Sequence, residues 1–224
     1  GTSLARLDDQ ARAPPVRIRG EKKRRRPLEV LRPDVIEKRS AFLKRVARIP
    51  AERLVFLDES GMNLSMSRTH AWVKRGEELI DRVPMCWGKN LTLLGAIRLS
   101  GFVVLSTVFA TANGDRFVGW VRSKLLPKLK RGDVIVMDNL RAHHDPRVVP
   151  ACRERGVRVL YQPPYSPDMN PIEPAWALQK QHVRRYAPRT ADHLRRVARR
   201  ARYRVTPRHC RNWFAHAGYQ VRPR

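Results

Sequence analysis

Short hydrophobic runs alternate with polar and turn-forming stretches through the middle of the chain, and these runs predict the strands of a sheet. Residues 54–57 and 134–137 are continuous apolar runs, typical of strands that are buried on both faces. Residues 91–99 and 102–109 are rich in β-forming residues and meet at a Ser-Gly pair, which indicates a hairpin. Residues 157–161 predict a further strand. The pattern therefore predicts five strands.

Apolar residues recur at helical spacing before, between and after these runs. A helix is expected to begin at Asp34, because Asp34 and Glu37 have the spacing of a capping box. Val35, Phe42 and Val46 then recur on one face of that helix. Further helices are predicted over residues 114–129, 147–155, 170–185 and 190–204, and from about residue 207. Antiparallel strands followed by alternating helices and strands predict one α/β domain, in which helices flank a mixed sheet.

Composition excludes several classes of protein. The chain has 224 residues, enough to bury a hydrophobic core. No run approaches the roughly 18 apolar residues of a membrane helix and no apolar signal segment opens the chain, so we expect no membrane partner. Cys86, Cys152 and Cys210 lie far apart, which argues against a disulfide scaffold or a cysteine zinc site and favours a reducing compartment.

The net charge indicates a polyanionic partner. The chain has 47 Lys+Arg against 20 Asp+Glu, a formal charge of +27, and DNA or RNA is the usual partner of so basic a chain because bound phosphates release counterions. Ten lysines leave 47 − 10 = 37 arginines, which reflects either bidentate phosphate binding or a GC-rich genome. The charge is concentrated in residues 22–26 and 184–211. It names a partner but no reaction.

Two of the predicted strands run directly into an aspartate. Asp58 follows one four-residue apolar run and Asp138 follows the other. If the two strands are parallel neighbours, they lie ~4.8 Å apart and bring both carboxylates to one edge of the sheet. A Mg²⁺ or Mn²⁺ ion there would relieve their repulsion. Glu173, in the first turn of the helix predicted after a proline-rich loop, is the candidate for a third ligand.

A purely structural interpretation of these acids also stays open. Asp58 and Asp138 would then cap the turns that follow their strands, as aspartate often does. Asn170 and Glu173 are three residues apart, so Glu173 would be the acid of a capping box at the start of its helix.

The segments around the three acids resemble the catalytic segments of DDE transposases. They comprise residues 57–63, 137–143 and 163–173, within a likeness that extends over about residues 52–219. The match is to the mariner-like bacterial branch, the insertion-sequence six-thirty family, whose last Asp and Glu are separated by 34 residues. Here the interval is 173 − 138 − 1 = 34 residues.

This resemblance implies an RNase H-like fold, with Asp58, Asp138 and Glu173 as catalytic residues and metal ligands. Two Mg²⁺ ions, for which Mn²⁺ can substitute, would support cleavage at transposon ends and attack of a 3′-OH on target DNA at a TA dinucleotide. The implied partners are transposon-end DNA, target DNA and a second copy of the chain. The implied location is the bacterial cytoplasm, in association with the nucleoid.

The resemblance also divides the chain. Residues 1–28 are expected to be a basic flexible arm or linker, residues 29–50 a helix leading into the catalytic domain, residues 51–219 the RNase H-like DDE domain and residues 220–224 a tail. Relatives carry helix-turn-helix modules before this domain, and the roughly fifty residues before the first motif are too few for a pair of them. We therefore expect either the catalytic half of a split gene, with a separate helix-turn-helix chain for end recognition, or a truncated remnant.

Residues near Asp138 carry weaker signals. His143 and His144 contact the scissile phosphate or orient a ligand carboxylate, or else they form a solvated loop pair, and we leave both outside the catalytic set. Asn139 either orients Asp138 or serves the turn.

Aromatic and arginine-rich segments are also ambiguous between packing and DNA contact. Core packing is favoured for Trp72, Trp87 and Trp120, whereas Tyr165 is the better candidate for stacking on a base. The helix over residues 190–204 has an apolar face for packing and an arginine face for duplex phosphates or for solvent.

Two other functions stay open beside the transposase. One is a non-catalytic DNA-binding remnant, although all three acids are present. The other is an RNase H-like nuclease or resolvase, against which the proline-rich segment argues by resemblance only.

Overall fold

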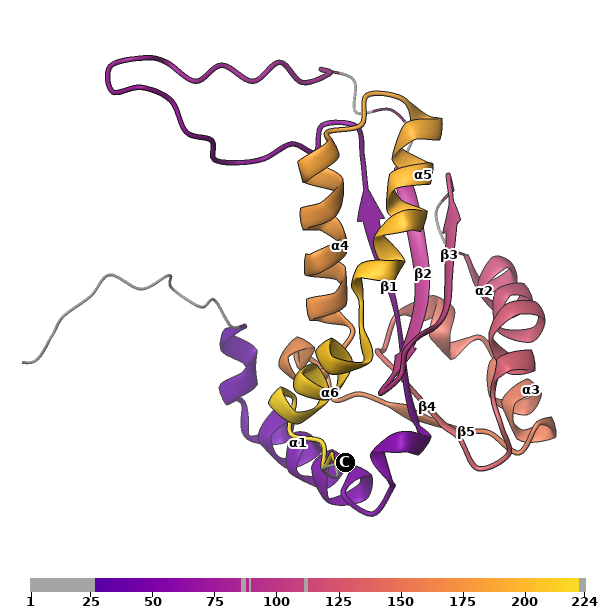
Figure 1. Ribbon diagram of the computed structural model, residues 1–224. Helices are drawn as coiled ribbons and strands as arrows, with labels where there is room; N and C mark the ends of the chain where they lie inside the picture. Colours follow the sequence, from indigo (N-terminus) through magenta and orange to yellow (C-terminus); the bar gives the residue numbers. More distant parts are fainter. Residues whose placement is uncertain (1–26, 86–87, 89, 111–112, 222–224) are drawn as a thin grey trace, which may run out of the picture.

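A five-stranded mixed sheet forms the centre of the molecule (Figure 1). The computed structural model describes residues 27–85, 88, 90–110 and 113–221. The strands are β1 (Leu54–Met62), β2 (Leu91–Arg98), β3 (Gly101–Val108), β4 (Val134–Met137) and β5 (Arg158–Tyr161). Their order in the sheet is β3-β2-β1-β4-β5. β1, β2 and β3 pair antiparallel, whereas β4 and β5 extend the sheet in parallel. The predicted mixed five-stranded sheet and its hairpin are confirmed.

Helices cover both faces of the sheet, and each face has its own core (Figure 1). The α-helices are α1 (Pro33–Val46), α2 (Gly114–Trp120), α3 (Val148–Glu154), α4 (Glu173–Tyr186), α5 (Ala191–Ala201) and α6 (Pro207–His216). On one face, side chains of α1, α4, α5 and α6 pack with Phe56 of β1. On the other, side chains of α2 and α3 pack with Val55 and Leu57. β1 is therefore buried on both faces, as its apolar run predicts.

Short helical turns complete the chain path. They lie at Leu28–Leu31, Ala51–Arg53, Val121–Leu125, Leu126–Lys128, Arg141–His144, Pro167–Met169 and Arg202–Arg204. The third and fourth of these continue α2, so the helical segment predicted over residues 114–129 is present as a whole. Among the residues that the structure describes, no helix has the length and apolar character to cross a membrane.

The first helix begins differently from the prediction. α1 starts at Pro33, with Arg32 as its N-cap and no capping bond from a side chain. Proline suits this first position because its φ is already fixed and it has no N–H to satisfy. The predicted capping box of Asp34 and Glu37 is therefore wrong, and Asp34 pairs instead with Arg32 and Lys38.

β1 is longer than predicted and holds Asp58 inside the strand rather than after it. The apolar run stops at Leu57, but β2 pairs antiparallel with residues 56–62 and continues the strand. β4 ends at Met137 as predicted, with Asp138 just beyond it. The two ends differ because ladder hydrogen bonds, rather than hydrophobicity, extend β1.

The chain between β1 and β2 leaves the body of the molecule as an extended loop (Figure 1). We call residues 63–85 the projecting segment. Arg189, in the loop between α4 and α5, fastens both of its ends. Its guanidinium donates to the backbone oxygens of Leu64 and Met66 at one end and of Arg82 at the other.

The tryptophans do not share one environment. Trp120 is buried as expected, and its Nε1 donates to Oγ of Ser106. Trp72 lies in the projecting segment and is fully exposed, so its predicted core packing is wrong, because the segment extends away from the core. Trp87 and Cys86 lie outside the described residues, as does the predicted basic arm up to residue 26.

Candidate active site

The parallel pairing of β1 and β4 brings Asp58 and Asp138 to the same edge of the sheet. Phe56 pairs with Val136, an offset of 136 − 56 = 80 residues. The same offset separates Asp58 from Asp138, so each acid comes two residues after this last pair, at the carboxyl end of the parallel pairing. The strands predicted to be parallel neighbours are neighbours, about 4.8 Å apart.

Glu173 completes a group of three carboxylates that interact through their charges. Burial, with repulsion from Glu173 and then from Asp138, raises the pKa of Asp58 to about 7. Burial and the charge of Asp138 also raise the pKa of Glu173. Within the described residues, no group of three or more acidic, His or Cys side chains forms a site that could hold a metal ion. The three acids are therefore neighbours that do not form a closed ligand cage.

The helix that carries Glu173 starts later than predicted. α4 begins at Glu173 itself, with Pro174 in its first turn, where a missing N–H costs nothing. Asn170 does not cap it through its side chain; the backbone N–H of Glu173 donates to the backbone oxygen of Asn170 at 3.2 Å. The capping-box interpretation of Glu173 is therefore wrong.

Asp58 is held by an indole that reaches it from α4. Nε1 of Trp176 donates to Oδ2 of Asp58 at 3.0 Å, and both residues are buried. Gly95 of β2 stands opposite Asp58 in the ladder. A Cβ at Gly95 would lie 2.5 Å from Cη2 of Trp176, closer than real Cβ contacts allow. The glycine thus makes room for the ring whose N–H orients Asp58.

Asp138 is held in a comparable way by His143, which is fully buried rather than solvated. Nδ1 of His143 lies 2.6 Å from Oδ1 of Asp138, the distance of a strong hydrogen bond donated to a carboxylate. Burial alone would raise the pKa of Asp138, but hydrogen bonds from His143 and from the Leu140 N–H hold it below its ordinary value. Both bonds reach Oδ1, which leaves Oδ2 open.

Glu59 belongs to the site although the sequence pattern does not single it out. It follows Asp58 in β1 and so points to the opposite face of the sheet. Its Oε1 lies 3.9 Å from Nε2 of His143, and both atoms are buried with no hydrogen-bond partner in the described structure. Burial raises the pKa of Glu59. Alternation of side chains along a strand would predict the position of Glu59, but only if β1 were known to continue past Leu57.

Lys180 is a second residue that the pattern does not reveal. Its charge opposes the effect of burial on the pKa of Glu173. The two residues are 180 − 173 = 7 positions apart, about two turns of α4 and on the same side of the helix. The seven-residue spacing is the available signal, and it places a cation about 10 Å along α4 from Glu173.

The loop after β4 is tied to the loop after β5 rather than to Asp138. Nδ2 of Asn139 donates to the backbone oxygen of Gln162 at 2.6 Å, and its Oδ1 lies 3.3 Å from Nε2 of His144. His144 stacks on Tyr161 with ring centroids 4.3 Å apart. Of the two roles open to Asn139, the structure supports the one in the loop.

The proline-rich loop that leads to Glu173 is held by α1. Arg39 forms two parallel bonds to Asp168, at 2.9 and 2.7 Å, and donates to Oγ of Ser166 at 2.8 Å. Tyr165 adopts a left-handed φ of 54° and is 44% exposed. Its ring is therefore available for the stacking role predicted for it.

The pKa of Asp58 predicts a pH dependence of stability. In the folded chain its pKa is about 7, against about 3.9 for an unfolded Asp. Between about pH 3.9 and pH 7 the folded state holds a proton on Asp58 that the unfolded state lacks. The contribution of Asp58 to the free energy of unfolding therefore falls as the pH rises towards 7, and above that it is constant. Without metal ions, we expect the titration of Asp58 to lower the free energy of unfolding by about 2 kcal/mol when the pH is raised from 5.5 to 8.

Urea unfolding in EDTA at the two pH values measures this difference. Asp58→Asn is the matched control, because it removes the titrating group and keeps an oxygen for Trp176. An equal pH dependence in both proteins would contradict the assignment.

Comparison with known proteins places this site in a family. Residues 53–195 match the family model described as DDE superfamily endonuclease. The chain belongs to the DDE superfamily endonucleases. The resemblance seen in the three sequence segments is thereby confirmed at this level. A comparison with curated proteins gave no match.

This DDE endonuclease shares its fold with solved structures of a transposase. The Mos1 transposase paired-end complex with left transposon end matches with a TM-score of 0.58 at 18% identity, over 90% of this chain and 68% of the other. The Mos1 Strand Transfer Complex matches with a TM-score of 0.59 at 19% identity, over 92% and 68%. The Mos1 mariner paired end complex with Mn matches with 0.58 at 19% identity, over 92% and 68%. The RNase H-like fold is confirmed.

Asp58, Asp138 and Glu173 remain the predicted catalytic acids of this DDE endonuclease. The structure brings them to one edge of the sheet from β1, the end of β4 and the start of α4.

Proposed function

We propose that this DDE endonuclease is the transposase of a bacterial insertion sequence. It would cleave DNA at the ends of the element and join the free 3′-OH to target DNA at a TA dinucleotide. The observation that carries the proposal is the set of three interacting carboxylates, in β1, just after β4 and at the start of α4, in a chain of this family. The fold shared with a transposase whose structures include a strand transfer complex supports it.

The donor set suits divalent magnesium or manganese. Asp58, Asp138 and Glu173 offer only carboxylate oxygens, the ligands that these hard cations prefer. Mutual repulsion contributes to the raised pKa of Asp58 and Glu173, and cations between the acids would relieve it. We propose two ions, which when bound would activate the attacking water or 3′-OH and neutralise the leaving 3′-oxygen. The similar Mos1 paired-end complexes include one with Mn and one with Mg.

The protein prepares these acids through fixed hydrogen bonds. Trp176 holds Oδ2 of Asp58, and His143 and the Leu140 N–H hold Oδ1 of Asp138. Each aspartate is therefore oriented by hydrogen bonds from inside the protein, and for Asp58 the backbone N–H of Glu59 contributes one as well. Such fixed orientation lowers the cost of forming the reactive geometry.

The proposal includes partners and a location. Transposition joins two ends, so we propose that a second copy of the chain acts on the same DNA, and that a separate helix-turn-helix chain recognises the ends. The net charge of +27 supports DNA as the shared partner. We place the protein in the bacterial cytoplasm, at the nucleoid.

A joining assay tests the proposed function. A duplex with the terminal sequence that flanks the gene and a free 3′-OH is mixed with the chain, supercoiled plasmid and Mg²⁺. We expect joined products whose junctions lie at TA, and none after EDTA is added. Metal-dependent nicking without joined products would instead favour the nuclease or resolvase. Salt-sensitive DNA binding without nicking would favour the non-catalytic remnant.

A further inference from the structure

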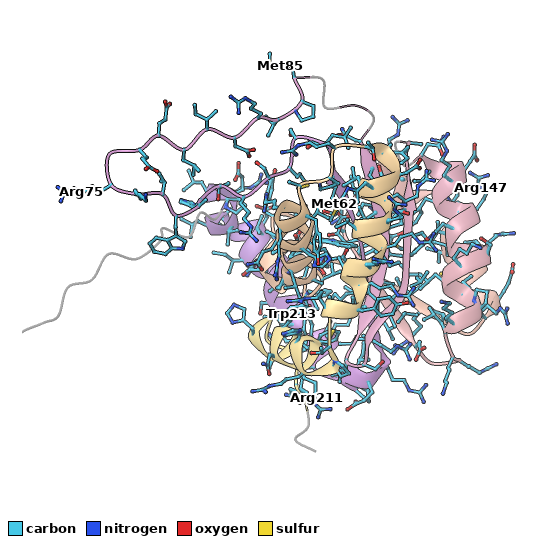
Figure 2. All side chains as sticks on the ribbon, turned by 45° about the horizontal axis from the view of Figure 1, so that its top comes forward. Met62, Arg75, Met85, Arg147, Arg211 and Trp213 are labelled. Carbon is cyan, nitrogen blue, oxygen red and sulfur yellow. The ribbon has the colours of Figure 1, made fainter. Side chains whose placement is uncertain are left out.

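A basic hollow lies between the projecting segment and the outer side of α4. It has a volume of about 470 Å³ and is lined by residues 68–70, by the second half of α4 and by Arg204, which follows α5. This volume is within the usual range of ligand sites. Figure 2 shows how the segment runs from the body out to Arg75 at its bend and back to Met85. One wall of the hollow therefore belongs to the segment and the other to the body.

The hollow is lined by cations without counter-charges. Four of its lining side chains are Arg68, Arg184, Arg185 and Arg204, and no lining residue is acidic. In the described part of the chain, none of these four arginines forms an ion pair, whereas Arg39, Arg98, Arg147 and Arg189 each do. Arginines gathered without an acid repel one another, and an anion between them removes that repulsion.

The pKa of His182, which lines the hollow, is lowered in part by the positive charge of two of these arginines. Burial, and then the charges of Arg204 and Arg185, lower the pKa of His182. His182 also lines a second hollow of about 350 Å³, together with His193, Arg196 and Arg200 of α5. The cationic surface therefore continues across α4 onto α5, which suits an extended polyanion better than a single small ion.

The hollow is separate from the three carboxylates. Glu173 and His182 are 182 − 173 = 9 residues apart on α4, which corresponds to about 14 Å along the helix and half a turn around it. Arg184 and Arg185 lie 11 and 12 residues after Glu173, about 17 to 18 Å along the helix. The arginines of α4 that line the hollow are thus separated from the acid that begins the helix by their distance along α4.

We propose that this hollow binds backbone phosphates of duplex DNA away from the reacting phosphate, and that it thereby fixes the projecting segment against α4. The inference rests on the proposed function, because that function supplies DNA as the polyanion. Arginine suits phosphate because its planar guanidinium donates two parallel bonds. The hollow contributes to holding the substrate and takes no part in the chemical step.

The test is the salt dependence of duplex binding, measured by fluorescence anisotropy with a labelled 30-base-pair duplex in EDTA. The double variant Arg68→Gln/Arg204→Gln removes one exposed cation from each wall. We expect weaker binding and a slope of log K against log salt that is smaller by about 2, since each phosphate contact contributes about 0.9. Arg122→Gln is the control and should leave the slope unchanged. Arg122 is exposed in the turn that follows α2, and it forms no ion pair with any residue that the structure describes.

Three further readings complete the test. The double variant should nick plasmid with a raised KM, whereas the Arg122→Gln control should keep the wild-type KM. Duplex should slow hydrogen exchange of residues 64–70 in the wild type but not in the variant. Inorganic phosphate without DNA should leave the wild-type melting temperature unchanged.

Each contrary result has a distinct meaning. An unchanged salt slope in the double variant would overturn the proposed phosphate site. Stabilisation by inorganic phosphate that the double variant lacks, together with an unchanged slope, would assign the hollow to a free anion instead. If the salt slopes of the wild type and the double variant differ as expected but the wild type neither nicks nor joins DNA, the proposed function is wrong. The hollow is then still a phosphate-binding site.

Discussion

Replacing Asp138 by Asn should abolish metal-dependent nicking of supercoiled plasmid. The substitution keeps the size of the side chain and an oxygen that can still accept from His143 and from the Leu140 N–H. It removes the negative charge that a divalent cation requires. Loss of several kcal/mol of transition-state stabilisation corresponds to a fall of about a thousandfold or more in rate. The measurement is the rate of conversion of supercoiled to nicked plasmid in Mg²⁺ and in Mn²⁺.

Asp115→Asn is the matched control for this experiment. Asp115 is an exposed acid at the start of α2 that pairs with Arg147, and its replacement should leave nicking unchanged. The Asp138→Asn protein should also bind duplex DNA as tightly as the wild type, which separates loss of chemistry from loss of folding. Nicking by Asp138→Asn at the wild-type rate would remove Asp138 from the proposed site.

A single methyl group at Gly95 should damage both stability and activity. In Gly95→Ala the new Cβ would lie 2.5 Å from the ring of Trp176, so the ring must move and its bond to Asp58 is lost or lengthened. Overpacking of this kind costs about 1–3 kcal/mol. Loss of a group that orients a metal ligand lowers metal affinity or activity by about 10- to 100-fold. Urea unfolding and the plasmid assay measure the two effects separately.

A second substitution distinguishes the steric effect from the hydrogen bond. Trp176→Phe shortens the ring, so Gly95→Ala/Trp176→Phe should be more stable than the sum of the single effects predicts, by about 0.5–3 kcal/mol. Its nicking should stay low because phenylalanine has no N–H for Asp58. Gly61→Ala in β1 is the control, since a Cβ there meets nothing within 4 Å. Full activity in the double variant would show that Trp176 does not orient Asp58.

The sequence predicted those parts of the fold that depend on local pattern. Continuous apolar runs gave β1 and β4 as buried strands, and the acids after them implied a shared edge. The 34-residue interval between Asp138 and Glu173, together with the surrounding motifs, pointed to the family, and the family model matches.

What the sequence did not predict depends on contacts between distant residues. The bond from Trp176 to Asp58 spans 118 positions, and the space for it comes from Gly95 on a third element. The ring of His143 packs against Phe117 of α2, which lies 26 positions away. The inclusion of Glu59 follows from β1 continuing along β2, which no hydrophobic run indicates. Trp72 fails as a prediction for the opposite reason. Its neighbours in the sequence are apolar, but the segment that carries it extends away from the core, so the side chain is exposed.

Arg189 fastens the two ends of the projecting segment, so the length of that segment does not affect the positions of the catalytic acids. One guanidinium holds the backbone near both of its ends, at Leu64 and at Arg82, and β1 and β2 are joined by their own ladder. The chain between the two ends can therefore lengthen or shorten without pulling on the strand that carries Asp58. In evolutionary terms, this is a part of the protein where new contacts can be acquired while the chemistry stays constant.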